Sequence, residues 1–133
     1  MINKKKSILV GIIILVLLAI LLIFLRGNED NWIKDSKGIW IKHGNPASTP
    51  LEVKEQQDAI SCASELYVFE SLRDVNFISQ CLGTCGNYAV DFVNVPRIVE
   101  DNQIENQCEG YLNGTSHHFI ELNNKDGTIV RIV

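Results

Sequence analysis

The longest apolar run in the chain covers residues 8–25 and contains no charged side chain and no amide side chain. As an α-helix, a run of about 18 residues rises about 1.5 Å per residue and reaches about 27 Å, close to the hydrocarbon thickness of a bilayer. A helix is the form expected there, because every backbone polar group needs a partner within the segment. We therefore expect a transmembrane helix over residues 8–25, preceded by a tail of residues 1–7.

A cleaved secretory signal is the main alternative to this anchor. Such a signal has a shorter apolar region that ends in small residues before the cleavage site. The run in this chain ends in Phe24-Leu25-Arg26, without a small-x-small pattern. The sequence therefore favours an uncleaved signal anchor. Because Lys4, Lys5 and Lys6 precede the run, the positive-inside rule places the N-terminus in the cytoplasm and the C-terminal domain outside the cell membrane.

The charge of the remaining chain narrows the classes of partner. Four of the twelve basic residues lie beside the apolar run, so residues 27–133 carry eight basic against all sixteen acidic residues, a net charge of −8. This balance argues against nucleic acid, whose binding depends on Lys and Arg neutralising phosphates. We expect the lipid bilayer, and another envelope protein, as partners.

After the apolar run, the polar pattern predicts a juxtamembrane hairpin and linker over residues 26–50. Two apolar-rich segments, residues 32–34 and 39–42, flank a turn that ends in Gly38. Trp32 and Trp40 are placed either in the lipid headgroup layer, where indoles are favoured, or against the domain. The sequence leaves both placements open.

The next segment has the signature of a helix start. Thr49 is the expected cap, Pro50 fits the first helical position, and the helix should extend to about Leu72. Its predicted buried stripe consists of Cys62, Leu66, Phe69 and Leu72, while residues 55–58 should form a solvated face.

Three further segments complete the predicted domain, residues 51–133. A second helix is predicted over residues 85–94, ending before Pro96. Residues 118–122 and 128–133 alternate in polarity around a turn at Asp126-Gly127, which predicts a hairpin. The expected fold class is α+β: one N-terminal transmembrane helix, then two helices packed on a small antiparallel sheet.

All four cysteines lie in this domain, at positions 62, 81, 85 and 108. An even number outside the membrane predicts two disulfides, with three possible pairings. An alternative is a tetrahedral zinc site made by Cys81, Cys85 and Cys108 with His117 or His118. We expect the disulfides, no metal and no cofactor.

One short motif points to modification. Asn113-Gly114-Thr115 is an Asn-x-Thr sequon in a predicted loop on the predicted outer side, so Asn113 is a candidate for glycosylation. An ordinary Asn-Gly turn explains the same residues.

A thiol-based reading starts at Cys85, in Gly83-Thr84-Cys85-Gly86-Asn87-Tyr88-Ala89, and continues at His118-Phe119-Ile120-Glu121. A cysteine at a helix start has a lowered thiol pKa. Residues 83–122 resemble the transglutaminase-like (papain-like) core, which implies Cys85 as nucleophile and His118 as base. In that family an Asp on the following strand orients the His, and here residues 128–133 contain no acid.

The front of the chain, residues 1–50, resembles a juxtamembrane segment of small single-span archaeal proteins, a likeness that implies location and no activity. Because no complete catalytic constellation is present, we expect a membrane-anchored binding or envelope-structural module. The alternative is a thiol enzyme, or a degenerate relative of one, that uses Cys85 and His118.

Overall fold

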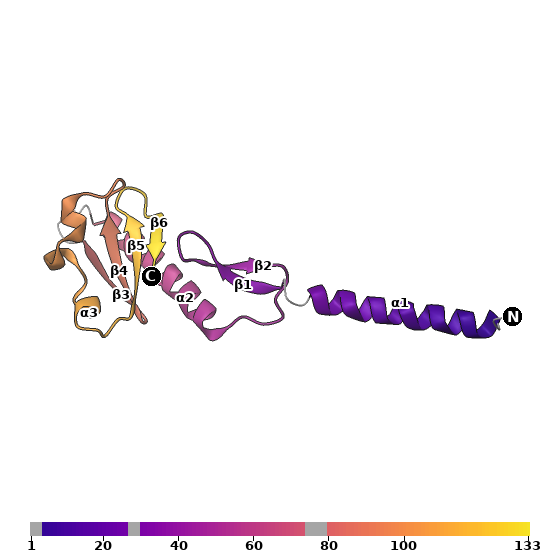
Figure 1. Ribbon diagram of the computed structural model, residues 1–133. Helices are drawn as coiled ribbons and strands as arrows, with labels where there is room; N and C mark the ends of the chain where they lie inside the picture. The colour runs from indigo at the N-terminus through magenta and orange to yellow at the C-terminus, as the bar shows by residue number, and fades with distance from the viewer. Residues whose placement is uncertain (1–3, 27–29, 74–79) are drawn as a thin grey trace. The chain divides into compact units, whose positions relative to one another are not determined.

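The structure, a computed structural model, describes residues 4–26, 30–73 and 80–133 (Figure 1). The predicted tail, residues 1–7, therefore lies partly outside the described residues. The chain divides into two compact units, residues 1–33 with 42–48, and residues 34–41 with 49–133. The α+β class is confirmed. The elements, in chain order, are α1 (Lys4–Arg26), β1 (Asn31–Lys34), β2 (Trp40–His43), α2 (Leu51–Ser71), β3 (Cys81–Cys85), β4 (Tyr88–Val93), the 3₁₀ turns η1 (Val99–Asn102) and η2 (Ile104–Asn106), α3 (Glu109–Leu112), β5 (His118–Asn123) and β6 (Ile129–Ile132).

The first unit contains α1, which covers the apolar run. Its segment Lys6–Leu25 has a mean hydropathy of 3.7, so α1 is long and apolar enough to cross a membrane. Further along this unit, the indole N–H of Trp32 donates to the carbonyl of Ser48 at 3.0 Å. The amide of Asn45 donates to Asp30 at 2.8 Å. These two bonds join the segment that enters the predicted hairpin to the segment that leaves it. The hairpin itself is formed by β1 and β2, which pair as a two-stranded sheet.

The second unit is built on a four-stranded sheet with the strand order β3-β4-β5-β6. The outer pairs are antiparallel, as expected, but β4 and β5 are parallel. Parallel neighbours cannot be joined by a tight turn and need a long crossover. Residues 94–117, which include η1, η2 and α3, make this connection. The predicted C-terminal hairpin is confirmed as β5 and β6.

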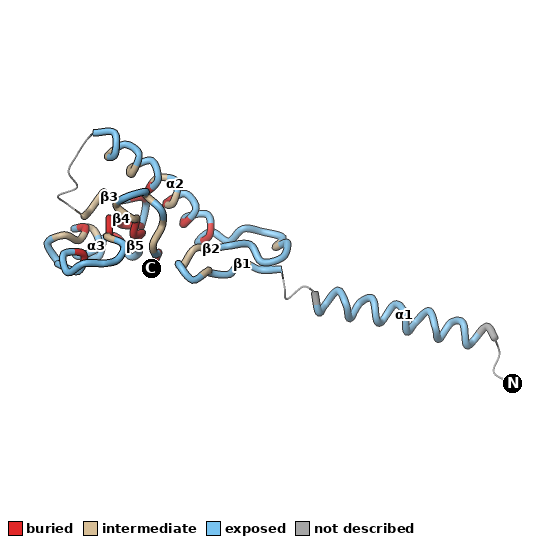
Figure 2. The backbone as a smooth tube through the Cα atoms, turned by 90° about the horizontal axis from the view of Figure 1, so that it is seen from above, coloured by how far each residue is buried: buried red, intermediate tan, exposed pale blue. Residues whose placement is uncertain are grey.

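One face of the sheet packs against α2 to form the core, which Figure 2 shows as the buried segments of the tube. The predicted stripe on α2 is half wrong: Cys62 and Leu66 pack on the core, but Phe69 and Leu72 are exposed. Gln56, expected in solvent, is buried. The buried residues of α2 lie at regular helical spacing and are Val53, Gln56, Ala59 and Ala63.

The start of α2 also differs from the prediction. The helix begins at Leu51, so Pro50 takes the cap position, and no side chain caps the helix there. Thr49 therefore lies one residue before the cap position, and the predicted cap hydrogen bond is not formed.

The helix predicted over residues 85–94 is wrong, because most of this segment is strand β4. Gly86 has a φ of +60° and, with Asn87, makes the tight turn between β3 and β4. A two-residue turn of glycine and asparagine is a hairpin signal. The following run, Tyr88–Val93, is almost entirely buried, as is typical of a strand covered on both faces.

Residues 34–41 belong to the same compact unit as the sheet. The amide of Ile132 in β6 donates to the carbonyl of Lys37 at 2.7 Å, and Lys37 Nζ donates to the carbonyl of Ile129 at 2.8 Å. Buried Gln56 of α2 donates to the carbonyl of Gly38 and accepts from the amide of Trp40. The tip of the juxtamembrane hairpin is therefore fastened to both the edge strand and the helix.

Candidate functional site

The two faces of the sheet have opposite chemistry, because side chains alternate along β4 and β5. Toward α2 the strands present apolar residues such as Val90 and Ile120, which are fully buried. On the other face Asp91 of β4 lies beside Glu121 of β5 in the parallel register. Arg131 of β6 lies opposite Glu121 on the same face. This second face is charged, although most of it is covered.

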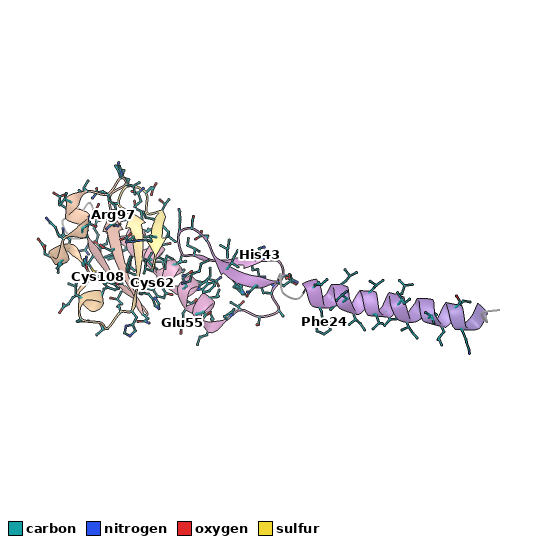
Figure 3. All side chains as sticks on the ribbon, viewed as in Figure 1. Phe24, His43, Glu55, Cys62, Arg97 and Cys108 are labelled. Atoms are coloured by element: carbon teal, nitrogen blue, oxygen red, sulfur yellow. A yellow bond between two sulfur atoms is a disulfide. The ribbon has the colours of Figure 1, made fainter. Side chains whose placement is uncertain are left out.

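The crossover, residues 94–117, covers the charged face and leaves a pocket of about 170 Å³, which we call the Asp91 pocket. The floor comes from the sheet and the walls from the crossover; Arg97 and Cys108 of the crossover are labelled in Figure 3. The lining residues are Ala89, Asp91, Arg97, Asp101, Asn102, Gln107, Cys108, Tyr111, Phe119, Glu121 and Arg131.

Glu121 is the centre of an ion-pair network in this pocket, and its side chain is only 5 % exposed. Arg131 binds it through two N–H groups, Nε to Oε2 at 3.1 Å and Nη2 to Oε1 at 2.9 Å. Arg97 Nη1 donates to Oε1 at 2.7 Å. The hydrogen bond to Glu121 raises the pKa of Arg131. Both carboxylate oxygens of Glu121 are therefore occupied by guanidinium groups.

Asp101 is the second buried acid, and it fastens the crossover to the sheet. Its carboxylate accepts hydrogen bonds from the amide of Ile98 at 2.8 Å and from the side chains of Gln80 and Asn94 at 2.9 Å. Burial alone would raise the pKa of Asp101, but these hydrogen bonds from Ile98 and Asn94, with the charge of Arg97, lower it. Asp101 thus stays ionised and is fully engaged in holding the loop.

Asp91 differs from the other two acids because no side chain among the described residues forms a hydrogen bond or ion pair with its carboxylate. Oδ1 of Asp91 is buried and has no hydrogen-bond partner among the residues that the structure describes. Burial, followed by the nearby charge of Glu121, raises the pKa of Asp91 to about 7, although the amide of Phe92 and the charge of Arg97 oppose this shift. Near neutral pH the Asp91 carboxyl is therefore divided between its protonated and ionised forms.

The pocket also has an aromatic wall. The rings of Tyr111 and Phe119 meet edge to face, with centroids 5.1 Å apart. The guanidinium of Arg131 lies over the Phe119 ring at 5.1 Å. An aromatic wall next to an acid is typical of sites that take an organic ligand with a polar end.

The cysteines form the two disulfides that the sequence predicts, and the structure selects one pairing of the three. Cys62 is bonded to Cys85, and Cys81 is bonded to Cys108. The first bridge ties α2 to the end of β3, and the second ties the start of β3 to the crossover. Each bridge therefore fastens the cover of one face of the sheet.

A β-bulge between Cys81 and Gly83 sends the two β3 cysteines to opposite faces. Residues four apart on a regular strand point the same way. Here Cys81 pairs with Asp91, on the pocket face, while Cys85 pairs with Tyr88, on the α2 face. The extra residue at the bulge shifts the alternation and makes the two separate bridges geometrically possible.

The predicted pair of Cys85 and His118 is not assembled for thiol chemistry. The sulfur of Cys85 is bonded to Cys62 and is not a thiolate. Cys85 ends β3 and His118 begins β5, with β4 between the two strands. The His118 ring is exposed and stacks on Tyr88, with centroids 4.8 Å apart. The helix start expected to lower the thiol pKa of Cys85 is a hairpin turn instead.

The alternative zinc site is not formed either. Cys81, Cys85 and Cys108 are all in disulfides. Within residues 4–26, 30–73 and 80–133, no group of three or more His, Cys, Asp or Glu side chains is placed to hold a metal ion.

Asn113 lies where the sequence predicts, in an exposed turn after α3. Its side-chain oxygen accepts a hydrogen bond from the Thr115 hydroxyl at 2.8 Å and one from the Thr115 amide at 3.0 Å. These bonds are those of an ordinary Asx turn. The sequon is thus exposed, and both interpretations of it remain predictions.

Sequence reasoning missed the Asp91 pocket, although one signal was present. Asp91 is the one charged residue in the run Tyr88–Val93, whose other members are all apolar. A single acid inside a fully apolar strand has to face a partner or a cavity, because an isolated buried charge is strongly unfavourable. Glu121 and Arg131, which line the same pocket, lie far from Asp91 in the sequence, so no spacing rule connects them to it.

Comparison with known proteins adds no family or neighbour: no protein-family model, no curated protein and no solved structure matches the chain significantly.

Proposed function

We propose that the chain is a single-span membrane protein, with its N-terminus in the cytoplasm, whose disulfide-bonded domain lies outside and binds a ligand in the Asp91 pocket. The observation that carries this proposal is that all four cysteines are paired in disulfides in a chain whose helix α1 is long and apolar enough to cross a membrane. Disulfides persist on the oxidising side of a membrane and are rare in the cytosol.

The orientation is supported by the charges around α1. Three lysines precede the apolar run, at positions 4–6, whereas one arginine follows it, and the acids Glu29 and Asp30 come next. This bias retains the N-terminus on the cytoplasmic side. The net charge of −8 on residues 27–133 is compatible with a domain held beside an anionic membrane surface.

A binding role agrees better with the site than catalysis does. Cys85 is not available as a nucleophile, and both oxygens of Glu121 are held by arginines. What is left is a pocket with an acid of unmatched charge and an aromatic wall. Such a pocket can hold a small organic group, either free or presented by another envelope protein.

Protease treatment of intact cells that make the full chain tests the location. We expect digestion of the domain, with only the α1 region protected, and two bridges, 62–85 and 81–108, in non-reducing peptide maps. A matched variant that replaces Lys4, Lys5 and Lys6 with Asn should lose the uniform orientation. A fully protected domain with four reduced thiols would contradict the proposal.

The binding half is tested with the purified full chain in detergent micelles. A thermal-shift screen of small cations, anions and neutral amides should find compounds that raise Tm and shift the NMR signals of Tyr111 and Phe119. A screen in which no compound of any class shifts these signals would contradict a binding role for the pocket, whatever the topology result.

A further inference from the structure

We propose that the Asp91 pocket recognises its ligand through a protonated primary amine, which the Asp91 carboxylate binds while the rest of the ligand packs against Tyr111 and Phe119. This inference rests on the proposed binding function and adds the chemical class of the ligand. Free amines and the lysine side chains of partner proteins both carry this ammonium group.

The charge balance of the pocket is the first step. Three acidic and two basic side chains line the pocket. The acids are Asp91, Asp101 and Glu121, and the bases are Arg97 and Arg131. The two arginines are both bound to Glu121, and Arg97 also donates to the backbone carbonyl of Asp101 at 3.1 Å. Without Asp91 the pocket is neutral; with Asp91 ionised it carries one excess negative charge. A monocation is the ligand that restores neutrality.

The existing hydrogen bonds argue against an anion. Arg97 donates hydrogen bonds to Glu121, to the carbonyl of Asp101 and to the side chain of Asn102. Arg131 donates through Nε and Nη2 to Glu121. An anion would have to compete with Glu121 for these guanidinium groups, and it would also be repelled by the charge of ionised Asp91.

The unsatisfied acceptor argues for a donor on the ligand. Oδ1 of Asp91 is buried and has no partner among the described residues. A carboxylate turns readily about its Cβ–Cγ bond, so either oxygen can face the pocket. An ammonium group supplies both the missing positive charge and three donors. Hydrogen bonds between such charged partners are about twice as strong as those between neutral ones.

The volume of the pocket and its aromatic wall determine the size and polarity of the rest of the ligand. The pocket volume of about 170 Å³ is similar to the roughly 150 Å³ cavity known to hold benzene. The edge-to-face pair of Tyr111 and Phe119 offers an apolar surface beside the acid. The ligand should therefore carry a compact organic group next to its ammonium, of about the size of one ring.

The groups that face Asp91 determine how the affinity for a cation changes with pH. They are Glu121 on β5, Arg97 and Asp101 on the crossover, with Arg131 on β6 completing the network. Because burial and Glu121 raise the pKa of Asp91 to about 7, raising the pH ionises it and prepares the site for a cation. Conversely, a bound ammonium group favours the ionised form and should lower the pKa of Asp91.

The test uses the full chain in micelles and three ligands of matched shape: benzylammonium, benzyl alcohol and benzoate. NMR signals of Tyr111 and Phe119, and of the Asp91 carboxyl carbon, report binding. At pH 8 we expect benzylammonium to bind at least tenfold more tightly than benzyl alcohol, and benzoate not to bind. Its affinity should fall roughly tenfold at pH 6, because the ionised fraction of Asp91 falls by about that factor. The methylamide of N-acetyl-lysine, compared with benzylammonium, tells a protein side chain from a free amine.

The variant Asp91→Asn has nearly the same shape and should lose at least tenfold in affinity for benzylammonium. Asp58→Asn is the matched control: it makes the same charge change beside another pocket, on the α2 side near Cys62, and should leave binding unchanged. Equal affinity in wild type and Asp91→Asn, tighter binding of benzoate, or no saturable shift with any ammonium would overturn the inference. If Asp91→Asn does not fold, the wild-type pH dependence decides. A different ligand class bound in this pocket would refute only the inference and leave the proposed function standing.

Discussion

The two faces of the four-stranded sheet are built by different means. The α2 face is apolar: Val90, Ile120 and Leu122 are almost completely buried and belong to the core against which α2 packs. The opposite face holds Asp91 and Glu121 under a crossover with little regular structure. Each face has its own disulfide. The α2 face therefore supplies stability through apolar area removed from water, whereas the charged face is less stabilising because it encloses a pocket.

Removing either disulfide should have the largest effect on stability. The bridges close loops with sequence separations of 23 and 27 residues. For loops of this length, the loss of a bridge is expected to cost about 3–4 kcal/mol. The double variants Cys62→Ser/Cys85→Ser and Cys81→Ser/Cys108→Ser should therefore be destabilised similarly in urea titrations. Only the second should weaken benzylammonium binding, because only Cys108 lines the Asp91 pocket. Equal loss of binding in both would erase the distinction between the faces.

Truncating one residue of β5 on each face compares how much the two faces contribute to stability. Leu122 is 1 % exposed, and Leu122→Ala should lower the free energy of unfolding by about 3 kcal/mol through lost contacts and the cavity left behind. Phe119→Ala, on the half-covered charged face, should cost only about 1–2 kcal/mol although it removes more atoms. Chemical denaturation measures both values. The opposite order would mean that the crossover face carries the core.

Breaking the ion-pair network is a smaller perturbation. Glu121→Gln keeps the shape and leaves Arg97 and Arg131 without their carboxylate, so we expect a loss of about 2 kcal/mol, moderated because both guanidinium groups are partly exposed. The loss should shrink at high salt. A variant as stable as the wild type would show that the network does not contribute to holding the crossover.

The last substitution, at Asp91, is expected to increase stability. The folded-state pKa of Asp91, raised to about 7, lies above its ordinary value of 3.8, so the folded protein holds a proton that the unfolded chain has released. Stability should thus decrease as the pH rises from about 4 to about 7. Asp91→Asn should add at least about 1 kcal/mol at pH 8 and little at pH 4, since it removes an unsatisfied buried charge. Thermal unfolding at the two pH values measures the difference; a pH-independent effect would contradict the raised pKa.

What could be predicted from the sequence follows the strength of the local pattern. The apolar run of α1, the extent of α2 to about Leu72 and the hairpin of β5 and β6 are strongly periodic, and each is confirmed. Strand β4 was missed because a short, wholly apolar run does not distinguish a buried strand from a helix. The Gly86-Asn87 turn was the local cue that would have decided it.

The candidate site was harder to predict for a different reason. The cysteines were recognised as a disulfide set, but their pairing depends on a single bulged residue between Cys81 and Gly83, which no sequence pattern reveals. The pocket depends on the parallel pairing of β4 and β5, which places Asp91 beside Glu121. These two acids are separated by thirty positions in the chain, so only the topology brings them together.

The attachment of Lys37 and Gly38 to β6 has a practical consequence for anyone who wants the domain without its lipid-embedded helix. A Cβ at Gly38 would collide with the carbonyl of Ile132, so the turn lies directly against the last strand. A secreted form that starts at residue 49 would lack this turn, so the amide of Ile132 would lose its hydrogen bond to Lys37. The exposed edge of β6 could then pair with a second copy of the chain. A form that starts at residue 30 retains the turn and both strands of the hairpin, and it should remain monomeric in solution.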